Sequence, residues 1–245
     1  MKRIYLEEGT DVSEILGIIH YEKPVPVQMR GQVRGNFPSN LVSKTDEERI
    51  QNIPEILNEL KGVQVYSTVK LDGTSATYLL YNGDYQVCSR NTSYKLIDDN
   101  KDNIYLRISE KYNIKEVLEK IGKNLAVQGE IVGPGIQKNR LGLKEIDFYV
   151  FNVYDIDKRE YLDFEMLKMF RDATGMKLVP IIEVFELNHT IDELLEMAKG
   201  FYDGTKNHRE GIVIRPVNSI KSNILKGDRA SFKIINNEFL LKEKE

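Results

Sequence analysis

The hydrophobic pattern changes along the chain, and short runs typical of β-strands dominate its middle. β-Branched and aromatic residues are concentrated at 63–69 and 74–81, a composition that predicts two strands. Asn82-Gly83 follows directly and predicts a tight hairpin turn into a strand at 84–90. The mostly apolar run 147–156 predicts a strand buried on both faces. Further strands are expected at 124–132, 178–187, 211–216 and 230–235.

Helical patterns occur between the groups of predicted strands. Thr45 followed by Glu48 is typical of a capping box and predicts a helix that Pro54 interrupts and that resumes up to Gly62. Other helices are expected at 104–121, with an irregularity near Asn113, and at 163–174. A further helix is expected after Thr190, because Thr190 and Glu193 have the spacing of a capping box. Because strands outnumber helices and many are joined by hairpins, we expect an α+β fold with antiparallel sheets and flanking helices.

The composition is that of a folded globular chain and excludes several classes of protein. The 245 residues carry 35 Lys and Arg against 38 Asp and Glu, a net charge of -3, so a polyanion must bind through a local basic patch. Cys88 is the only cysteine, which excludes an intramolecular disulfide framework and a Cys-rich zinc site. No run approaches the ~18 apolar residues of a membrane span, and the N-terminus lacks the apolar core of a signal peptide. We therefore expect a cytoplasmic protein with no membrane partner.

Candidate chemistry begins with Lys70-Leu71-Asp72-Gly73, which lies between two predicted strands. A turn in this place presents its side chains from rigid supports into a cleft. The alternative is an ordinary turn with a surface lysine, because Asp-Gly is common in turns. The pattern Lys-x-Asp-Gly occurs by chance in roughly one chain in fifteen of this length, so the turn alone is weak evidence.

Three further charged residues stand where buried strands disfavour them. Glu130 lies near the end of an apolar strand, Glu210 immediately precedes the run 211–216, and Lys233 interrupts the apolar run 230–235. Each is either a strand-end charge that reaches solvent or a partner for a polyanion and its metal ions. Together with Lys70 they favour a polar site between the strands.

Six segments, in this order, resemble the motifs of the covalent nucleotidyltransferases, and within them the ATP-dependent RNA ligases. They are Lys70-Leu71-Asp72-Gly73, Ser89-Arg90-Asn91, Gln128-Gly129-Glu130, Tyr149-Val150-Phe151-Asn152-Val153, Glu210-Gly211-Ile212-Val213-Ile214-Arg215 and Ser231-Phe232-Lys233-Ile234-Ile235. Ser75 stands where DNA ligases and capping enzymes usually carry an arginine, which favours RNA joining. Ile235 stands where the family often has a second lysine, so phosphate contact by the last motif rests on Lys233.

The resemblance implies an ATP-grasp-like nucleotidyltransferase (adenylation) domain and a reaction in three steps. Lys70 attacks the α-phosphate of ATP to form lysyl-AMP, AMP passes to a 5′-phosphate end, and a 3′-OH RNA end is then joined to it. The implied roles are phosphate contact by Lys233 and Arg90, ribose contact by Glu130, adenine stacking on Phe151, and Mg²⁺ or Mn²⁺ ligation by Glu210 and Asp72. The implied partner is RNA or an RNA-containing nicked duplex.

Other functions and the domain limits stay open at this point. The alternatives are a capping-type guanylyltransferase, a DNA ligase core, or a non-catalytic RNA-binding relative. The segment 35–52 is similar to the entry into the transferase domain of ligases that carry an N-terminal OB-fold module. We expect 1–15 to be a lead-in or the remnant of a preceding module, and 16–245 to be the nucleotidyltransferase domain. Basic residues expected to contact RNA are Lys138, Arg140, Lys144, Lys221, Lys226 and Arg229.

Overall fold

The computed structural model describes residues 5, 10, 12–18, 31–225 and 228–242. The chain divides into two compact units, Met1–Gly31 and Gln32–Glu245. The described residues of the first unit include a short helix, α1 (Ser13–Leu16), and every element discussed below belongs to the second unit. The expected division at residue 15 stays a prediction. Within the described residues, no helix is both long and apolar enough to cross a membrane.

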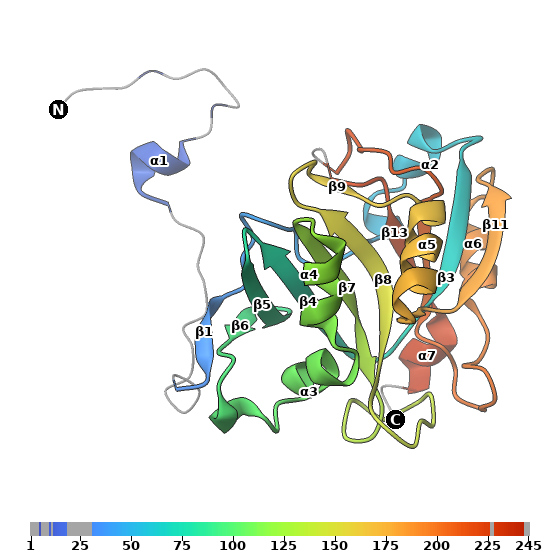
Figure 1. Ribbon diagram of the computed structural model, residues 1–245. Coiled ribbons are helices and arrows are strands. Elements are labelled where there is room, and N and C mark those ends of the chain that lie inside the picture. Colours follow the sequence, from blue (N-terminus) through green and yellow to red (C-terminus); the bar gives the residue numbers. More distant parts are fainter. Residues whose placement is uncertain (1–4, 6–9, 11, 19–30, 226–227, 243–245) are drawn as a thin grey trace. The chain divides into compact units, whose positions relative to one another are not determined.

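The larger of two sheets has eight strands and is almost entirely antiparallel (Figure 1). Its order is β1 (Val33–Asn36), β6 (Thr92–Tyr94), β5 (Asp84–Ser89), β4 (Thr74–Tyr81), β7 (Leu125–Val132), β8 (Asp147–Asp155) and β10 (Lys177–Leu178), with β9 (Glu160–Tyr161) also paired to β8. Asn82 and Gly83 both adopt positive φ in the turn between β4 and β5, which confirms the predicted hairpin. We call this the large sheet.

The second sheet has five strands, and we call it the small sheet. Its order is β11 (Ile181–Glu186), β3 (Gln64–Lys70), β12 (Gly211–Pro216), β13 (Phe232–Ile235) and β2 (Glu48–Arg49). The chain leaves the small sheet at Lys70, the last residue of β3, and enters the large sheet at Thr74, the first residue of β4. The predicted nucleophile turn is therefore the crossing between the two sheets.

Helices flank the sheets, which confirms the predicted α+β class. They are α2 (Ile56–Glu59), α3 (Ile104–Lys111), α4 (Ile114–Ile121), α5 (Phe164–Thr174), α6 (Ile191–Ala198) and α7 (Asn237–Lys242), with 3₁₀ turns η2 (Ile50–Asn52) and η3 (Asp98–Asn100). The irregularity expected near Asn113 separates α3 from α4, and Asn113 has a left-handed φ of 46°. Helix α4 packs against β4, and α6 packs against β12 and β13.

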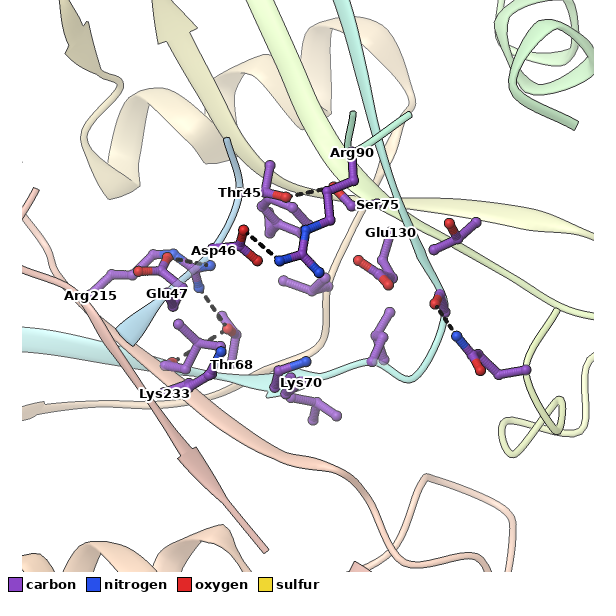
Figure 2. A pocket seen from close by; sticks show the side chains of 18 residues that line it. Thr45, Asp46, Glu47, Thr68, Lys70, Ser75, Arg90, Glu130, Arg215 and Lys233 are labelled. Carbon is purple, nitrogen blue, oxygen red and sulfur yellow. Dashed lines mark hydrogen bonds and ion pairs between the residues drawn. The ribbon is translucent and has the colours of Figure 1, made fainter. Parts of the chain in front are cut away.

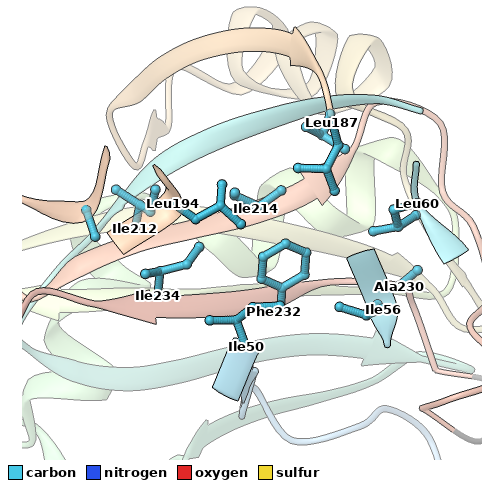
Figure 3. Close-up of a cluster of buried hydrophobic side chains, with 12 residues drawn as sticks. Ile50, Ile56, Leu60, Leu187, Leu194, Ile212, Ile214, Ala230, Phe232 and Ile234 are labelled. Carbon is cyan, nitrogen blue, oxygen red and sulfur yellow. The ribbon is translucent and has the colours of Figure 1, made fainter. Parts of the chain in front are cut away.

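A hydrophobic core lies beneath the small sheet and fixes two of its strands (Figure 3). Ile212 and Ile214 of β12 and Phe232 and Ile234 of β13 are all completely buried in it. Because side chains alternate across a strand, the residues between them face the opposite side of the sheet. This alternation explains why a lysine interrupts the apolar run 230–235: Lys233 is turned away from the core.

Two predicted elements are wrong. Thr45 does not cap a helix; its Oγ1 lies 2.6 Å from Ser75 Oγ, and the residues that follow form β2 and η2 before the four-residue α2. The predicted strand 178–187 is two strands, β10 in the large sheet and β11 in the small sheet, separated by Val179 and Pro180. Because proline has no N–H to donate to a strand ladder, Pro180 favours a break between β10 and β11 at this position.

Candidate active site

A cavity of about 300 Å³ opens between the two sheets and collects most of the predicted site residues (Figure 2). The small sheet contributes residues of β3, β12 and β13, and the large sheet contributes residues of β4, β7 and β8. Its polar and aromatic lining residues include Lys70, Arg90, Glu130, Phe151, Arg215 and Lys233. Motifs that are far apart in the sequence therefore meet in one polar site.

Lys70 lies at the floor of this cavity and is paired with Glu210. Its Nζ is 2.7 Å from Glu210 Oε1, and the two side chains are 26% and 20% exposed. The β3–β12 register places Gly211 opposite Lys70, so Glu210 comes just before the ladder begins. A Cβ at Gly211, where φ is 152°, would lie 2.0 Å from the carbonyl oxygen of Ile234. Only glycine fits there, and this close approach fixes the position of Glu210.

The crossing loop after Lys70 is held from the large sheet. A Cβ at Gly73 would lie 2.3 Å from the carbonyl oxygen of Ile131, so glycine is required for the loop to approach β7 this closely. Asp72 is not among the cavity-lining residues; its Oδ2 accepts a hydrogen bond from Arg140 Nε at 3.0 Å. Burial and the neighbouring Glu210 raise the pKa of Asp72. The Asp72 side chain of this loop is thus bound to an arginine and does not line the cavity.

Lys233 provides a second cation beside Lys70. It lies opposite Val213 in the β12–β13 register, and Figure 2 shows it on the same side of the cavity as Lys70. Burial, and then the charge of Lys70, lowers the pKa of Lys233. A half-buried lysine whose charged form is disfavoured by a neighbouring lysine is well placed to bind an anion.

The large sheet supplies groups suited to a nucleoside. The pKa of Glu130 is raised to about 8, mainly by burial and also by the charges of Glu210 and Asp72, which together outweigh the opposing charge of Lys70. At neutral pH its carboxyl group is then largely protonated, and it offers both a donor and an acceptor to a ligand. Phe151 is half-buried on β8 and lines the cavity, so that part of its ring is available for stacking.

Arg90 lies at the cavity entrance, where it connects the two sheets. Its side chain is 60% exposed, and its guanidinium is 2.8 Å from Asp46 Oδ2, just before β2. An exposed ion pair of this kind contributes little to stability. Arg90 is therefore able to exchange Asp46 for a phosphate at small cost.

Sequence reasoning missed the segment 45–47 and assigned no role to Arg215. Glu47 lines the cavity and lies between Arg215, at 3.2 Å, and Arg229, at 3.5 Å. Burial raises the pKa of Glu47, but the two arginines and a hydrogen bond from Ser231 outweigh it and hold that pKa below its usual value. The run of acidic residues 46–48 is the sole sequence signal for this buried cluster.

Two of the residues expected to contact RNA are not on the surface. Arg140 and Arg229 are 8% and 7% exposed, because each neutralises a carboxylate in the interior, Asp72 and Glu47 respectively. The expectation that they form an RNA-binding surface is wrong. Lys138, Lys144 and Lys221 are exposed, and Lys226 lies outside the described residues.

The carboxylates of the site fit a hard divalent cation that has other ligands besides the protein. Glu210 and Asp72 both raise the pKa of Glu130, and Glu210 also raises the pKa of Asp72, so a cation near these carboxylates would relieve their repulsion. Within the described ranges, no three acidic, histidine or cysteine residues form a ready-made metal cage. Mg²⁺ is commonly held by one or two carboxylates together with phosphate oxygens and water, which suits this arrangement.

Comparisons with known proteins agree with this geometry. The RNA ligase family model matches residues 63–235. A search of curated protein sequences returned no match. Among solved structures, RNA ligase from Naegleria gruberi is similar in a mutant form with ATP and Mn (37% identity, TM-score 0.78, 96% of this chain and 67% of that chain). The same ligase with PPi is also similar (38% identity, TM-score 0.77, 96% and 68%).

A mutant of that ligase with AMP and Mn gives the same match (37% identity, TM-score 0.78, 96% of this chain and 68% of that chain). The chain thus spans about two thirds of the Naegleria protein. The family model covers the segment from β3 to β13, which contains Lys70, Glu130, Glu210 and Lys233. With most of its length matched by the family model and nearly all of it by an RNA ligase fold, this chain belongs to the RNA ligase family.

Proposed function

We propose that this chain is the adenylate-forming part of an ATP-dependent RNA ligase and that Lys70 is its nucleophile. The observation that carries the proposal is the position of the Lys70 amine, 2.7 Å from Glu210 and close enough to a second cation, Lys233, to affect its charge, in a cavity lined from two sheets. The Naegleria structures with ATP, AMP and PPi support a reaction of this kind.

In the first step, the Lys70 ammonium loses one proton to water as it leaves its ion pair with Glu210, and the lone pair freed on Nζ attacks the α-phosphorus of ATP. A P–N bond forms, the bond between the α-phosphorus and its bridging oxygen breaks, pyrophosphate leaves, and the amine's proton passes to water. Glu210 Oε1 orients the amine, and Lys233 stabilises the negative charge that grows on the α-phosphate oxygens. A bound Mg²⁺ or Mn²⁺, held by Glu210 and with Asp72 as the weaker candidate, would neutralise phosphate charge.

The large-sheet residues hold the nucleoside during this step. Phe151 offers a ring face to the adenine, and Glu130 offers hydrogen bonds to ribose hydroxyls. Arg90 presents a planar fork of donors to phosphate oxygens once it leaves Asp46. ATP then bridges the cavity from one sheet to the other.

We propose a nicked duplex with RNA at the 3′-OH end as the substrate of the later steps. AMP moves from Lys70 to the 5′-phosphate, and the 3′-OH then displaces AMP as the new phosphodiester forms. Lys138 and Lys144 are exposed in the loop between β7 and β8, and Lys138 directly follows the cavity-lining residue Gln137. Both are our candidates for phosphate contacts.

Intact-mass measurement after incubation with ATP and Mg²⁺ or Mn²⁺ tests the first step. We expect the mass of one added AMP, located at Lys70 by peptide mapping, and no adduct with GTP. A GMP adduct would support a capping-type enzyme instead, and no adduct with either nucleotide would support a non-catalytic relative. Sealing of pre-adenylylated nicks should require RNA at the 3′-OH end, whereas equal sealing with DNA would support a DNA ligase core.

A further inference from the structure

Tyr202 belongs to none of the six motifs, yet its hydroxyl lies where two site residues meet. The side chain is 3% exposed, and it packs with Leu71 and Val179 beneath the cavity. Its hydroxyl donates a hydrogen bond to the carbonyl oxygen of Lys70 at 3.0 Å and accepts one from the backbone N–H of Glu210 at 3.1 Å. One side-chain atom therefore joins the backbones of the two residues whose side chains form the 2.7 Å ion pair.

The need for such a contact follows from the strand register. The antiparallel ladder of β3 and β12 ends at the pair Lys70 and Gly211. Past this pair the two strands separate, and buried backbone groups there need other partners. The Tyr202 hydroxyl supplies a donor to one strand and an acceptor to the other, so both of its hydrogen-bonding functions are used.

The position of Tyr202 is fixed by hydrogen bonds within its own turn, without any contact from a ligand. Its N–H donates to the carbonyl oxygen of Asn207 at 2.9 Å, and its carbonyl oxygen accepts a hydrogen bond from Thr205 Oγ1 at 2.9 Å. Phe201 and His208 form a β-bridge that closes the turn. The hydroxyl is thus a fixed point to which the crossing loop and the start of β12 are attached.

We infer that Tyr202 is a positioning residue for lysine adenylylation. Its hydroxyl holds the backbone of Lys70 and Glu210 in the register that aligns the amine with the α-phosphate. A displacement of about 1 Å in a reacting group is enough to slow a reaction by orders of magnitude, so two hydrogen bonds at this place affect the rate more than the binding of nucleotide. The inference rests on the proposed function, because it concerns the same amine.

The test compares Tyr202→Phe with a matched control, Tyr78→Phe. Both substitutions remove only a hydroxyl; the Tyr78 hydroxyl is also buried and donates to a backbone carbonyl at 3.0 Å, that of Tyr105 in α3. Single-turnover formation of the AMP adduct is measured by intact mass over a range of ATP concentrations. Binding of α,β-methylene-ATP, which cannot transfer its nucleotide, is measured separately by calorimetry.

We expect Tyr202→Phe to lower the maximal adenylylation rate by about tenfold and to leave the dissociation constant of α,β-methylene-ATP within about twofold of wild type. Tyr78→Phe should change neither value. An unfolded variant would also lose nucleotide binding. Retained binding of α,β-methylene-ATP therefore shows that the slower rate comes from a misplaced Lys70 amine and not from misfolding. A maximal rate within twofold of wild type, or a loss of binding that accounts for the slower rate, would overturn the positioning role.

A double-mutant cycle sharpens the result. If Tyr202 acts through the alignment of Lys70 with Glu210, Tyr202→Phe should have a smaller effect on the rate in a Glu210→Ala background than in wild type. An equal factor in both backgrounds would show that the hydroxyl acts independently of Glu210 and would overturn the inference. A wild-type protein that forms no adduct would instead refute the proposed function, and the role of Tyr202 with it, whereas adduct formation without a Tyr202 effect refutes only the latter.

Discussion

The two walls of the cavity differ in both chemistry and support. The small-sheet wall carries the cations Lys70, Lys233 and Arg215 on β3, β13 and β12, and the opposite face of those strands is packed into a core of completely buried side chains. The large-sheet wall carries Phe151 and Glu130 on its strands, with Arg90 just after β5 and 60% exposed. Most of the lining cations therefore lie on the wall that is packed into a core, and the proposed nucleoside contacts lie on the other.

This difference suggests that the small-sheet wall mainly determines the rate of adenylylation and that the large-sheet wall mainly determines the binding of ATP. Stabilising a transition state needs charges that do not move, and strands anchored in a core provide such positions. Holding a nucleotide tolerates more adjustment, as in the exposed pair of Arg90 and Asp46. Substitutions on the small sheet should thus lower the rate, and substitutions on the large sheet should raise the ATP requirement or change stability.

The largest effect is expected at Lys70. Both Lys70→Ala and Lys70→Arg should abolish the AMP adduct, because alanine has no nucleophile and a guanidinium stays protonated. Lys70→Arg keeps a cation next to Glu210 and so controls for loss of the ion pair. Intact mass after prolonged incubation with ATP measures both. An adduct of normal yield in either variant would contradict the assignment of the small sheet as the reacting wall.

Glu210 and Lys233 should come next, with reductions of about 10²- to 10³-fold in the maximal adenylylation rate for each change to alanine. The reason is that both groups act on charge that develops in the transition state. Lys177→Ala provides the control, since its ammonium pairs with Asp147 at 2.6 Å and does not line the cavity. If Lys233→Ala reached the wild-type rate at high ATP concentration, Lys233 would belong with the binding residues and the comparison of the walls would fail.

How far the sequence predicts this arrangement depends on the range of the interactions involved. The hydrophobic pattern and the turn residues predict the strands from β3 to β5 because both are local signals, and Lys233 is a candidate because it interrupts an apolar run. The sequence predicts the segment 45–47 wrongly because its contacts are distant along the chain: Thr45 forms a hydrogen bond with Ser75, and Glu47 forms an ion pair with Arg215. A local capping pattern cannot compete with tertiary contacts of this kind.

On the large sheet, Phe151→Leu and Arg90→Ala should raise the ATP concentration for half-maximal adenylylation by about tenfold or less, with a smaller change in the maximal rate. Leucine keeps an apolar contact but removes the stacking face. Arg34→Ala is a suitable control for Arg90, because Arg34 also forms an exposed ion pair on this sheet, with Asp84 at 2.8 Å, outside the cavity. A fall in the maximal rate with an unchanged ATP requirement would contradict this prediction, because it would show that Phe151 and Arg90 act on the transition state and not on ATP binding.

The smallest expected effect is a pH dependence of stability from Glu130. Burial raises its pKa from 4.5 to about 8, so between those values the folded protein binds a proton that the unfolded chain does not. The stabilising contribution of this group is therefore fully present below the unfolded pKa of 4.5 and is lost as the pH rises through about 8. Glu130→Gln removes the titration and keeps a similar shape.

The Tm of wild type relative to this variant should fall by a few degrees between about pH 5 and about pH 9. Glu119→Gln, an exposed carboxylate 3.8 Å from Lys115, should show no comparable trend, and a constant difference between wild type and Glu130→Gln at all pH values would show that Glu130 is ionised throughout.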